Sequence, residues 1–325
     1  MSGSTPAGAP ESPAGTVLFV AGAGRSGSTV LSRTLGLHPD VFAPGELRYV
    51  WDQGVLRDRP CGCGTEFSRC DFWQEVGAAA FGGWSKDVAS RAVTLRRAVD
   101  RVRHVPALVA PRGRFRDHVL EYTELLSRLD AALRTVSGAS VIVDTSKEPS
   151  TAYLMRHVPG IDLRLLHLVR SSQGVCFSWS RSVQRQDRAG ALMARHPVAR
   201  TAVEWDVYNT MVDGLRRLVR PSMLLRYEDF ISRPGEVIAQ VLQLSGSSAR
   251  SLLEPDGRSV DLPLSHSVAG NPMRFRSGPE RLQLDERWRT EMPRSAHAAV
   301  LAITGPIMVR YGYPLRRGAS VATVG

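Results

Sequence analysis

A glycine-rich segment near the start of the chain has the residue types of an anion-binding site. Residues 22–29 read Gly-Ala-Gly-Arg-Ser-Gly-Ser-Thr. Glycines allow backbone N–H groups to turn toward a ligand, and a helix that begins here adds the partial positive charge of its N-terminus. Gly22 and Gly27 match the glycines of the GxxxxGK[ST] phosphate loop, but Ser28 replaces its Lys and Arg25 supplies the positive charge. The segment is predicted to bind an anion other than the γ-phosphate of ATP; the alternative is a tight turn capped by Ser.

Two further residues, Glu46 and Lys147, are candidates for proton transfer. A carboxylate just downstream of an anion site repels the anion unless it has a role such as accepting a proton; a salt bridge of Glu46 with Arg48 or a helix cap is the structural alternative. Lys147 and Lys86 are the only lysines, against forty arginines. Because Lys can release a proton and Arg cannot, a retained Lys after a predicted strand favours a catalytic position over a surface one.

Arg170 and Ser178 are a candidate pair for a second phosphate. Arg170 ends the apolar run Asp162-Leu-Arg-Leu-Leu-His-Leu-Val-Arg, and Ser178 lies two turns into the helix predicted to follow. A guanidinium at the carboxyl end of a buried strand is well placed to bind phosphate. The alternative is an ordinary strand-end Arg with a Ser on a helix surface.

Three cysteines form a C-x-C-x6-C cluster, at Cys61, Cys63 and Cys70. Three thiolates are one ligand short of a closed zinc site, and His38 or His104 is the candidate for the fourth. A compact loop with packed thiols, or a single disulfide, is the alternative that we favour at this stage. No metal is expected to be needed.

The pattern of apolar runs predicts the elements that position these residues. Strand-like runs alternate with helical periodicity, which favours a doubly wound parallel α/β sheet, P-loop-like and flanked by helices. The predicted strands are residues 17–21, 140–144, 162–170 and 222–226. Amphipathic spacing predicts two or three helices over residues 85–133, with a break near 106–113. Residues 1–15 and 316–325 are predicted to be flexible tails, leaving one domain over 16–315 with a helical insertion at about 50–135.

Composition limits the class of protein. The chain has 325 residues, 43% of them hydrophobic, and a formal net charge of +11. The positive charge is spread along the chain without a basic cluster among aromatics, so nucleic-acid binding is not expected and an enzyme for anionic ligands fits better. No apolar run reaches the length of a membrane helix, and the first fifteen residues lack the features of a signal peptide, so we expect a cytoplasmic protein. The oligomeric state is left open.

Taken together, these motifs resemble those of the sulfotransferases that use 3′-phosphoadenosine 5′-phosphosulfate (PAPS). The segment 24–29 is similar to the 5′-phosphosulfate loop of that family, and Leu168-Val-Arg170 with Ser178-Trp179 to its 3′-phosphate motif. Tyr227-Glu-Asp-Phe and the loop Gly270-Asn-Pro-Met-Arg274 also resemble family segments. His-Pro-Asp-Val at 38–41 and Gly-Glu-Leu-Arg at 45–48 look closer to tyrosylprotein sulfotransferases and bacterial relatives. Two features depart from the family: Arg170-Ser-Ser replaces Arg-Asp-Pro, and no His matches the base of the cytosolic small-molecule enzymes.

The resemblance implies a PAPS-dependent sulfotransferase of the EC 2.8.2 class that needs no metal. By resemblance to the Lys before a Pro in tyrosylprotein sulfotransferases, Lys147 is expected to assist the leaving group. Our hypothesis for the mechanism is that Glu46 is the general base and that Arg25 stabilises the 5′-phosphate and the transferring group. The cofactor-binding residues that the resemblance implies are Gly24, Arg25, Ser26, Gly27, Ser28, Thr29, Arg170, Ser178, Tyr227 and Arg274. The competing interpretations are a P-loop kinase, for which Asp144 is the only Mg²⁺ ligand candidate, and a non-catalytic nucleotide-binding module.

The acceptor is expected to be a hydroxyl of a small molecule or glycan, such as a phenol, a sugar or a natural product. No motif identifies it. Acceptor contacts are expected in the regions 50–135 and 180–215. Their aromatic residues are candidates for an apolar acceptor pocket: Trp51, Phe72, Trp73, Trp84, Trp205 and Tyr208. Trp205, Tyr208 and Met211 share one face of a predicted helix, and packing in the core is the more common role of such a face.

Overall fold

The structure is a computed structural model that describes residues 15–181 and 195–315. The predicted tails, apart from Gly15, lie outside the described residues, as does the segment 182–194 of the expected acceptor region. Gly15 belongs to the first strand rather than to a tail.

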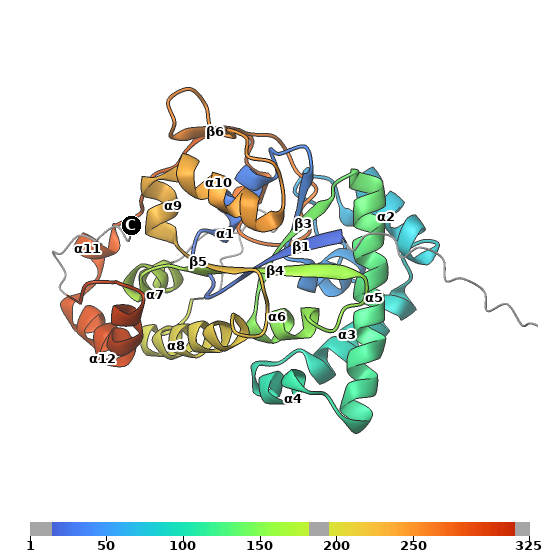
Figure 1. Ribbon diagram of the computed structural model, residues 1–325, viewed down its shortest axis with the longest axis horizontal. Helices are drawn as coiled ribbons and strands as arrows, with labels where there is room; N and C mark the ends of the chain where they lie inside the picture. Colours follow the sequence, from blue (N-terminus) through green and yellow to red (C-terminus); the bar gives the residue numbers. More distant parts are fainter. Residues whose placement is uncertain (1–14, 182–194, 316–325) are drawn as a thin grey trace, which may run out of the picture.

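A five-stranded parallel sheet forms the centre of the protein, in the order β2-β3-β1-β4-β5 (Figure 1). The four predicted strands are confirmed, and the fifth, β2, is the short extended segment before Glu46. The strands are β1 Gly15–Ala21, β2 Val41–Gly45, β3 Val141–Lys147, β4 Ile161–Val169 and β5 Ser222–Arg226.

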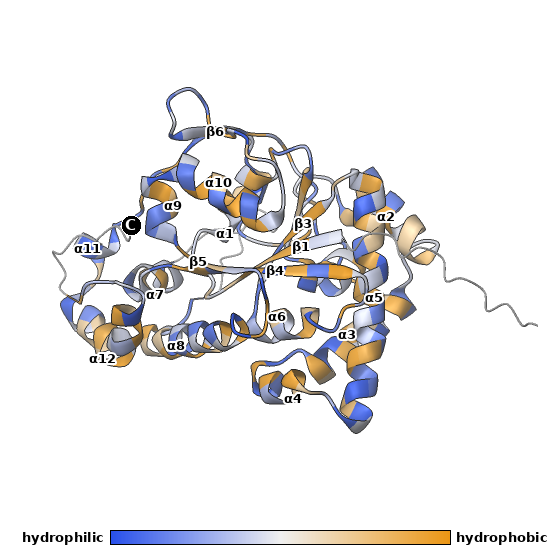
Figure 2. Cartoon of the chain, in the orientation of Figure 1, coloured by the Kyte–Doolittle hydropathy of each residue, from blue (hydrophilic) through white to orange (hydrophobic). Residues whose placement is uncertain are grey.

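Helices cover both faces of the sheet, as the strand sequences predict. In β1, Leu18 and Val20 pack with α1 (Ser28–Leu35) and α10 (Pro234–Ser245). The alternate residues Val17 and Phe19 pack in the core that contains α6 (Pro149–Met155) and α8 (Val198–Leu215). Because both faces are buried, the strand is apolar without a break, and Figure 2 shows hydrophobic residues along the sheet and both polar and apolar faces on the helices. The doubly wound architecture is confirmed.

The segment between β2 and β3 is mostly helical. It contains α2 Asp71–Phe81, α3 Lys86–Val99, α4 Val105–Val109 and the 25-residue helix α5 Gly113–Ser137, which packs against α2 and α3. The predicted break near 106–113 is where α4 ends and α5 begins; α2 was not predicted. Short turns connect β2 to the insertion: η1 Leu47–Tyr49, the π-helix η2 Val50–Val55 and η3 Phe67–Arg69, with η4 Val102–His104 before α4.

The remaining elements surround the other end of the sheet. They are α7 Ser172–Ser180, α9 Tyr227–Ser232, the antiparallel pair β6 Ser259–Leu262 and β7 Gly278–Arg281, η5 Pro272–Phe275, α11 Trp288–Glu291 and α12 Arg294–Arg310. Among the described residues, none of these helices combines the length and apolar character needed to span a bilayer.

The topology brings the predicted site residues to one edge of the sheet. The chain leaves β1 toward β2 on one side and leaves β3 toward β4 on the other, so the direction of winding reverses beside β1. Open α/β sheets bind ligands at the carboxyl ends of the strands at such a reversal. Each of the five strands contributes a residue at or just after that end: Arg25 after β1, Glu46 after β2, Lys147 in β3, Arg170 after β4 and Tyr227 after β5.

Candidate active site

A cavity of about 640 Å³ lies at this edge of the sheet. Eleven of the twelve residues predicted for the site line it: Gly24, Arg25, Gly27, Ser28, Thr29, Glu46, Lys147, Arg170, Ser178, Tyr227 and Arg274. Ser26 differs from the expectation. Its side chain is buried, and its hydroxyl donates to the carbonyl of Ala23 at 2.8 Å. Ser26 therefore stabilises the turn without lining the cavity.

The glycine-rich loop joins β1 to α1, so the predicted order of strand, glycine turn and helix is present. Gly27 adopts φ 88° as the residue before the first turn of α1. A Cβ atom on Gly27 would lie 2.5 Å from the ring of Tyr227, so Gly is required both by the backbone and by this close approach. Arg25 also has a left-handed backbone, with φ 70°, which is uncommon for a residue with a side chain.

Two arginines and a serine from three elements converge beside this loop. Arg25 Nε donates to Ser178 Oγ at 2.9 Å. Arg170 Nη1 donates to the Arg25 carbonyl at 3.2 Å, and its guanidinium lies 4.7 Å from the centre of the Tyr227 ring. Burial and the nearby charge of Arg170 lower the pKa of Arg25, as expected where positive charge is concentrated. The predicted convergence of the loop with Arg170 and Ser178 is therefore present.

Asp285, which carries no motif in the sequence and was not predicted, partly balances this positive charge. Arg170 Nη2 donates to the Asp285 carbonyl at 2.8 Å and lies 3.5 Å from its carboxylate. Arg287 Nε donates to the same carboxylate at 2.7 Å. This hydrogen bond, followed by the charge of Arg170, lowers the pKa of Asp285 to about 2.

Lys147 and Glu46 form an ion pair in the wall of the cavity. Lys147 Nζ donates to Glu46 Oε1 and, at 2.8 Å, to the carbonyl of Thr145; both side chains are 15% exposed. Lys147 has φ 68°, and the pairing of β1 with β3 shifts register between Phe19 and Ala21, so an irregular strand end directs Lys147 toward Glu46. Glu46 therefore pairs with Lys147, while Arg48, its alternative partner, forms an ion pair with Asp100.

Arg48, that alternative partner, instead binds Asp100 through Nη1. Its backbone N–H donates to Ser146 Oγ at 3.0 Å. Ser146 in turn donates to Asp144 Oδ1 from its hydroxyl at 2.5 Å and from its backbone at 2.8 Å. Burial raises the pKa of Asp144 to about 6. Asp144 thus binds Ser146 at the end of β3, next to Lys147 in the chain, and does not line the cavity. Because Asp144 was the only Mg²⁺ ligand candidate, this position argues against the kinase interpretation.

A loop over residues 266–275 covers Glu46. Val268 N–H donates to the Pro44 carbonyl at 2.9 Å, and a Cβ atom on Gly45 would lie 2.6 Å from the carbonyl of Ala269. One on Gly270 would lie 3.6 Å from Glu46 Oε1. This covering loop contains the Gly270–Arg274 segment that resembles a family loop, and its closure over a cofactor stays a prediction.

Arg274 lies at the end of this loop, and its guanidinium is engaged with the protein. Arg274 Nη1 donates to the Ser267 carbonyl at 2.6 Å, and Nη2 to that of Pro60 at 2.7 Å. The residue is 4% exposed. It fixes the loop to the cysteine-containing segment, and a direct contact with a nucleotide stays a prediction.

The expectation of an aromatic acceptor pocket is wrong for most of its residues. Trp51, Trp73 and Trp205 are fully buried, because large apolar side chains fill the core between the sheet and the helices that cover it. Of the six aromatics, only Tyr208 lines the cavity. The cavity is also lined by polar side chains, among them Tyr49, Gln53, Arg59, Glu148 and Glu204, and by apolar ones such as Trp179, Val268, Met273 and Phe275.

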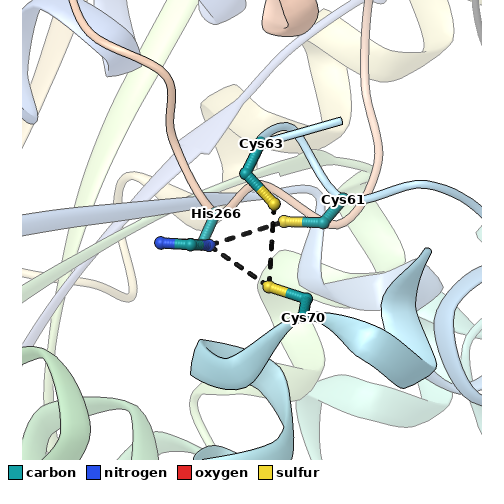
Figure 3. Close-up of side chains that lie close together, drawn as sticks. All are labelled: Cys61, Cys63, Cys70 and His266. Carbon is teal, nitrogen blue, oxygen red and sulfur yellow. Dashed lines mark hydrogen bonds between the residues drawn. The ribbon is translucent and has the colours of Figure 1, made fainter. Parts of the chain in front are cut away.

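The three cysteines lie together, with a histidine that was not predicted to join them. The Sγ atoms of Cys61, Cys63 and Cys70 converge on Nδ1 of His266, which begins the covering loop (Figure 3). Both histidines proposed from the sequence lie elsewhere: His38 contacts Ser248, and His104 contacts Arg103 and Phe115.

Comparison with known proteins identifies the family and supports the fold. The family model described as "Sulfotransferase family" matches residues 18–249, which include the glycine-rich loop, Glu46, Lys147, Arg170 and Tyr227. A search of curated proteins finds no match.

Two solved structures are similar over most of this chain. The sulfotransferase domain from the Synechococcus PCC 7002 olefin synthase is 18% identical, with a TM-score of 0.50 over 92% of this chain and 96% of that one. The sulfotransferase domain from the curacin biosynthetic pathway is 16% identical, with a TM-score of 0.50 over 94% of this chain and 100% of the other. At these identities the structures support the fold, and the family match covers well over half of the sequence. The chain belongs to the sulfotransferase family.

Proposed function

We propose that this protein transfers a sulfuryl group from PAPS to a hydroxyl of a small-molecule or glycan acceptor, such as a phenol, a sugar or a natural product. The observation that carries the proposal is the contact of Lys147 with Glu46 in the same cavity as the paired arginines Arg25 and Arg170. An acid and a base for proton transfer then lie beside a site for anions.

The donor is proposed to bind along the carboxyl ends of β1 and β4. The glycine-rich loop and Arg25 bind the 5′-phosphosulfate, since backbone N–H groups and a helix N-terminus favour an anion there. Arg170 and Ser178 bind the 3′-phosphate, for which a guanidinium and a hydroxyl are suitable donors. The hydrogen bond from Arg25 to Ser178 brings together the side chains proposed for the two phosphates, which supports binding of one nucleotide that carries both. Tyr227 flanks both.

The proposed reaction is an in-line displacement at sulfur. Glu46 accepts the proton of the acceptor hydroxyl as its oxygen forms a bond to sulfur. The bond between sulfur and the 5′-phosphate oxygen breaks, and Lys147 donates a hydrogen bond to that departing oxygen. Charge grows on the leaving phosphate, so positive groups fixed in advance lower the barrier. The acceptor hydroxyl binds beside the Glu46–Lys147 ion pair and separates the two groups.

The acceptor side of the cavity favours a polar molecule. Tyr208 donates to Glu148 at 2.7 Å, and Glu204 and Gln53 line the same cavity. Burying these groups against a purely apolar ligand leaves hydrogen-bond partners unsatisfied, which costs binding energy. A sugar or polyhydroxylated acceptor satisfies them better.

Transfer of labelled sulfate from PAPS into a panel of phenols, sugars and glycosylated natural products, read by mass spectrometry, tests the proposal. We expect at least one polar acceptor to gain one sulfate per reacting hydroxyl, with release of 3′-phosphoadenosine 5′-phosphate. If neither transfer nor PAPS binding occurs while ATP with Mg²⁺ is turned over, the proposal is wrong.

A further inference from the structure

Four side-chain atoms that can bind a metal lie close together next to the cavity. The Sγ atoms of Cys61, Cys63 and Cys70 and Nδ1 of His266 all lie within 4.8 Å of one another. Cys63 Sγ is 3.8 Å from Cys70 Sγ, Cys61 Sγ is 3.8 Å from His266 Nδ1, and Cys70 Sγ is 3.3 Å from the same nitrogen. Figure 3 shows these side chains pointing toward a common centre from separate segments of the chain.

These separations match those around a four-coordinate zinc ion. With Zn–S of about 2.3 Å and Zn–N of about 2.0 Å, tetrahedral angles place two sulfurs about 3.8 Å apart and a sulfur and a nitrogen about 3.5 Å apart. Thiolate and imidazole ligands in a closed set of four favour Zn²⁺ over the hard cations, which prefer oxygen.

The surroundings of the sulfurs fix their positions. A backbone N–H contacts each one: that of Cys63 at Cys61, that of Thr65 at Cys63 and that of Trp73 at Cys70. Such contacts orient the ligand atoms around a metal site. The ring of Phe72 stacks on His266, with centroids 4.8 Å apart and planes 11° apart, which fixes the imidazole.

We propose that Cys61, Cys63, Cys70 and His266 bind one zinc ion in a closed structural site. None of the four lines the cavity, so the ion takes no part in the transfer reaction. A disulfide between Cys63 and Cys70 is the competing arrangement, and it leaves Cys61 and His266 without a reason to converge on the same centre.

The site joins the insertion to the covering loop. His266 begins the loop, and Gly62 N–H donates to the Ser267 carbonyl at 2.8 Å beside it. Four residues after His266, Gly270 lies over Glu46. This role of the site rests on the proposed function of the cavity: the zinc ion fixes the loop that lies over the reacting groups. The metal site itself rests only on the four ligands, and its test does not depend on transfer.

Metal analysis of the full chain, purified under reducing conditions, tests the site. We expect one zinc per chain by inductively coupled plasma mass spectrometry, and X-ray absorption with three sulfur ligands and one nitrogen ligand. Apo protein, prepared with a chelator and kept reduced, is expected to take up Co²⁺ with the intense visible bands of tetrahedral thiolate coordination. A folded wild-type protein that contains no zinc and takes up no Co²⁺ overturns the proposal, as does a Cys63–Cys70 disulfide in the reduced preparation.

Matched variants identify the ligands. His266→Ala and Cys70→Ser are expected to lose most of the zinc, whereas His266→Cys keeps it because a fourth thiolate also suits the ion. His104→Ala and Cys176→Ala change the same residue types elsewhere and are expected to keep full zinc content. Full zinc in soluble His266→Ala contradicts the assignment. If that variant does not fold, loss of zinc-dependent thermal stability in His266→Cys overturns it instead.

Discussion

Lys147 and Glu46, 101 positions apart in the chain, form an ion pair at the carboxyl edge of the sheet. The pair depends on the irregular end of β3, where Lys147 takes a left-handed backbone, and on the covering loop, where Gly270 approaches Glu46. In the proposed reaction these two residues are the general base and the donor to the leaving group, and the acceptor hydroxyl separates them. Because the two residues have different proposed roles, substituting one at a time tests each role by itself.

Glu46→Gln removes the proton acceptor while keeping the size and a hydrogen-bonding oxygen of the side chain. We expect kcat to fall by about 10² or more, with the affinity for 3′-phosphoadenosine 5′-phosphate nearly unchanged. Steady-state kinetics with calorimetry measure the two effects. Glu124→Gln, on an exposed part of α5, is the control; near-normal turnover of Glu46→Gln removes Glu46 from the mechanism.

Lys147→Ala is expected to lower kcat by about 10² or more, because the departing oxygen loses its hydrogen-bond donor. Lys86→Ala changes the only other lysine, which is exposed at the start of α3, and is expected to have normal activity. Leaving-group effects give a sharper measurement, since PAPS analogues with better leaving groups are predicted to restore part of the rate. Equal activity of the two variants contradicts the role of Lys147.

Gly27→Ala tests the packing of the glycine-rich loop against Tyr227. A new Cβ atom at φ 88° costs about 1–2 kcal/mol of folding free energy and also overlaps the Tyr227 ring. Gly82→Ala has a similar backbone, with φ 72°, and meets no atom within 4 Å. We expect both variants to lose stability in denaturant titrations, but only Gly27→Ala to lose nucleotide affinity, by about tenfold or more.

Asp144 is expected to make stability depend on pH. Its pKa of about 6 in the folded protein lies above the ordinary value of 3.8, so the folded state binds more protons between these values. The free energy of unfolding therefore falls as pH rises from about 4 to 6, by about 3 kcal/mol from this group. Asp144→Asn keeps the oxygen that binds Ser146 and cannot titrate. Urea titrations across this range are expected to show a smaller fall for the variant; equal slopes contradict the assignment.

The sheet and the glycine-rich loop could be predicted because their causes are local. Buried parallel strands are continuous apolar runs, and a strand that turns through glycines into a helix has few alternatives. Lys147 stood out for a different reason, the scarcity of Lys in an Arg-rich chain. The strand β2 is short and interrupted by Pro44, so its sequence shows only an extended segment.

Contacts between distant segments could not be predicted in the same way. His266 lies 205 positions from Cys61, and only the fold brings the covering loop to the cysteine-containing segment. The burial of Trp51 and Trp73 was not predicted either, because the sequence around an aromatic residue does not distinguish one that packs in a core from one that lines a pocket. For Trp205, core packing was the more common alternative, and that alternative is the one the structure shows. Asp285 carries no motif and gains its role only beside Arg170 and Arg287.

The most direct test of the account is the calorimetric affinity of the protein for two nucleotides that differ only in the 3′-phosphate. Wild-type protein is predicted to bind 3′-phosphoadenosine 5′-phosphate at least about tenfold more tightly than adenosine 5′-monophosphate, since a charged hydrogen bond contributes about 1.5–3 kcal/mol. Arg170→Ala is predicted to lose most of this preference. Equal affinities in the wild-type protein, or no binding of the bisphosphate at all, would contradict the account.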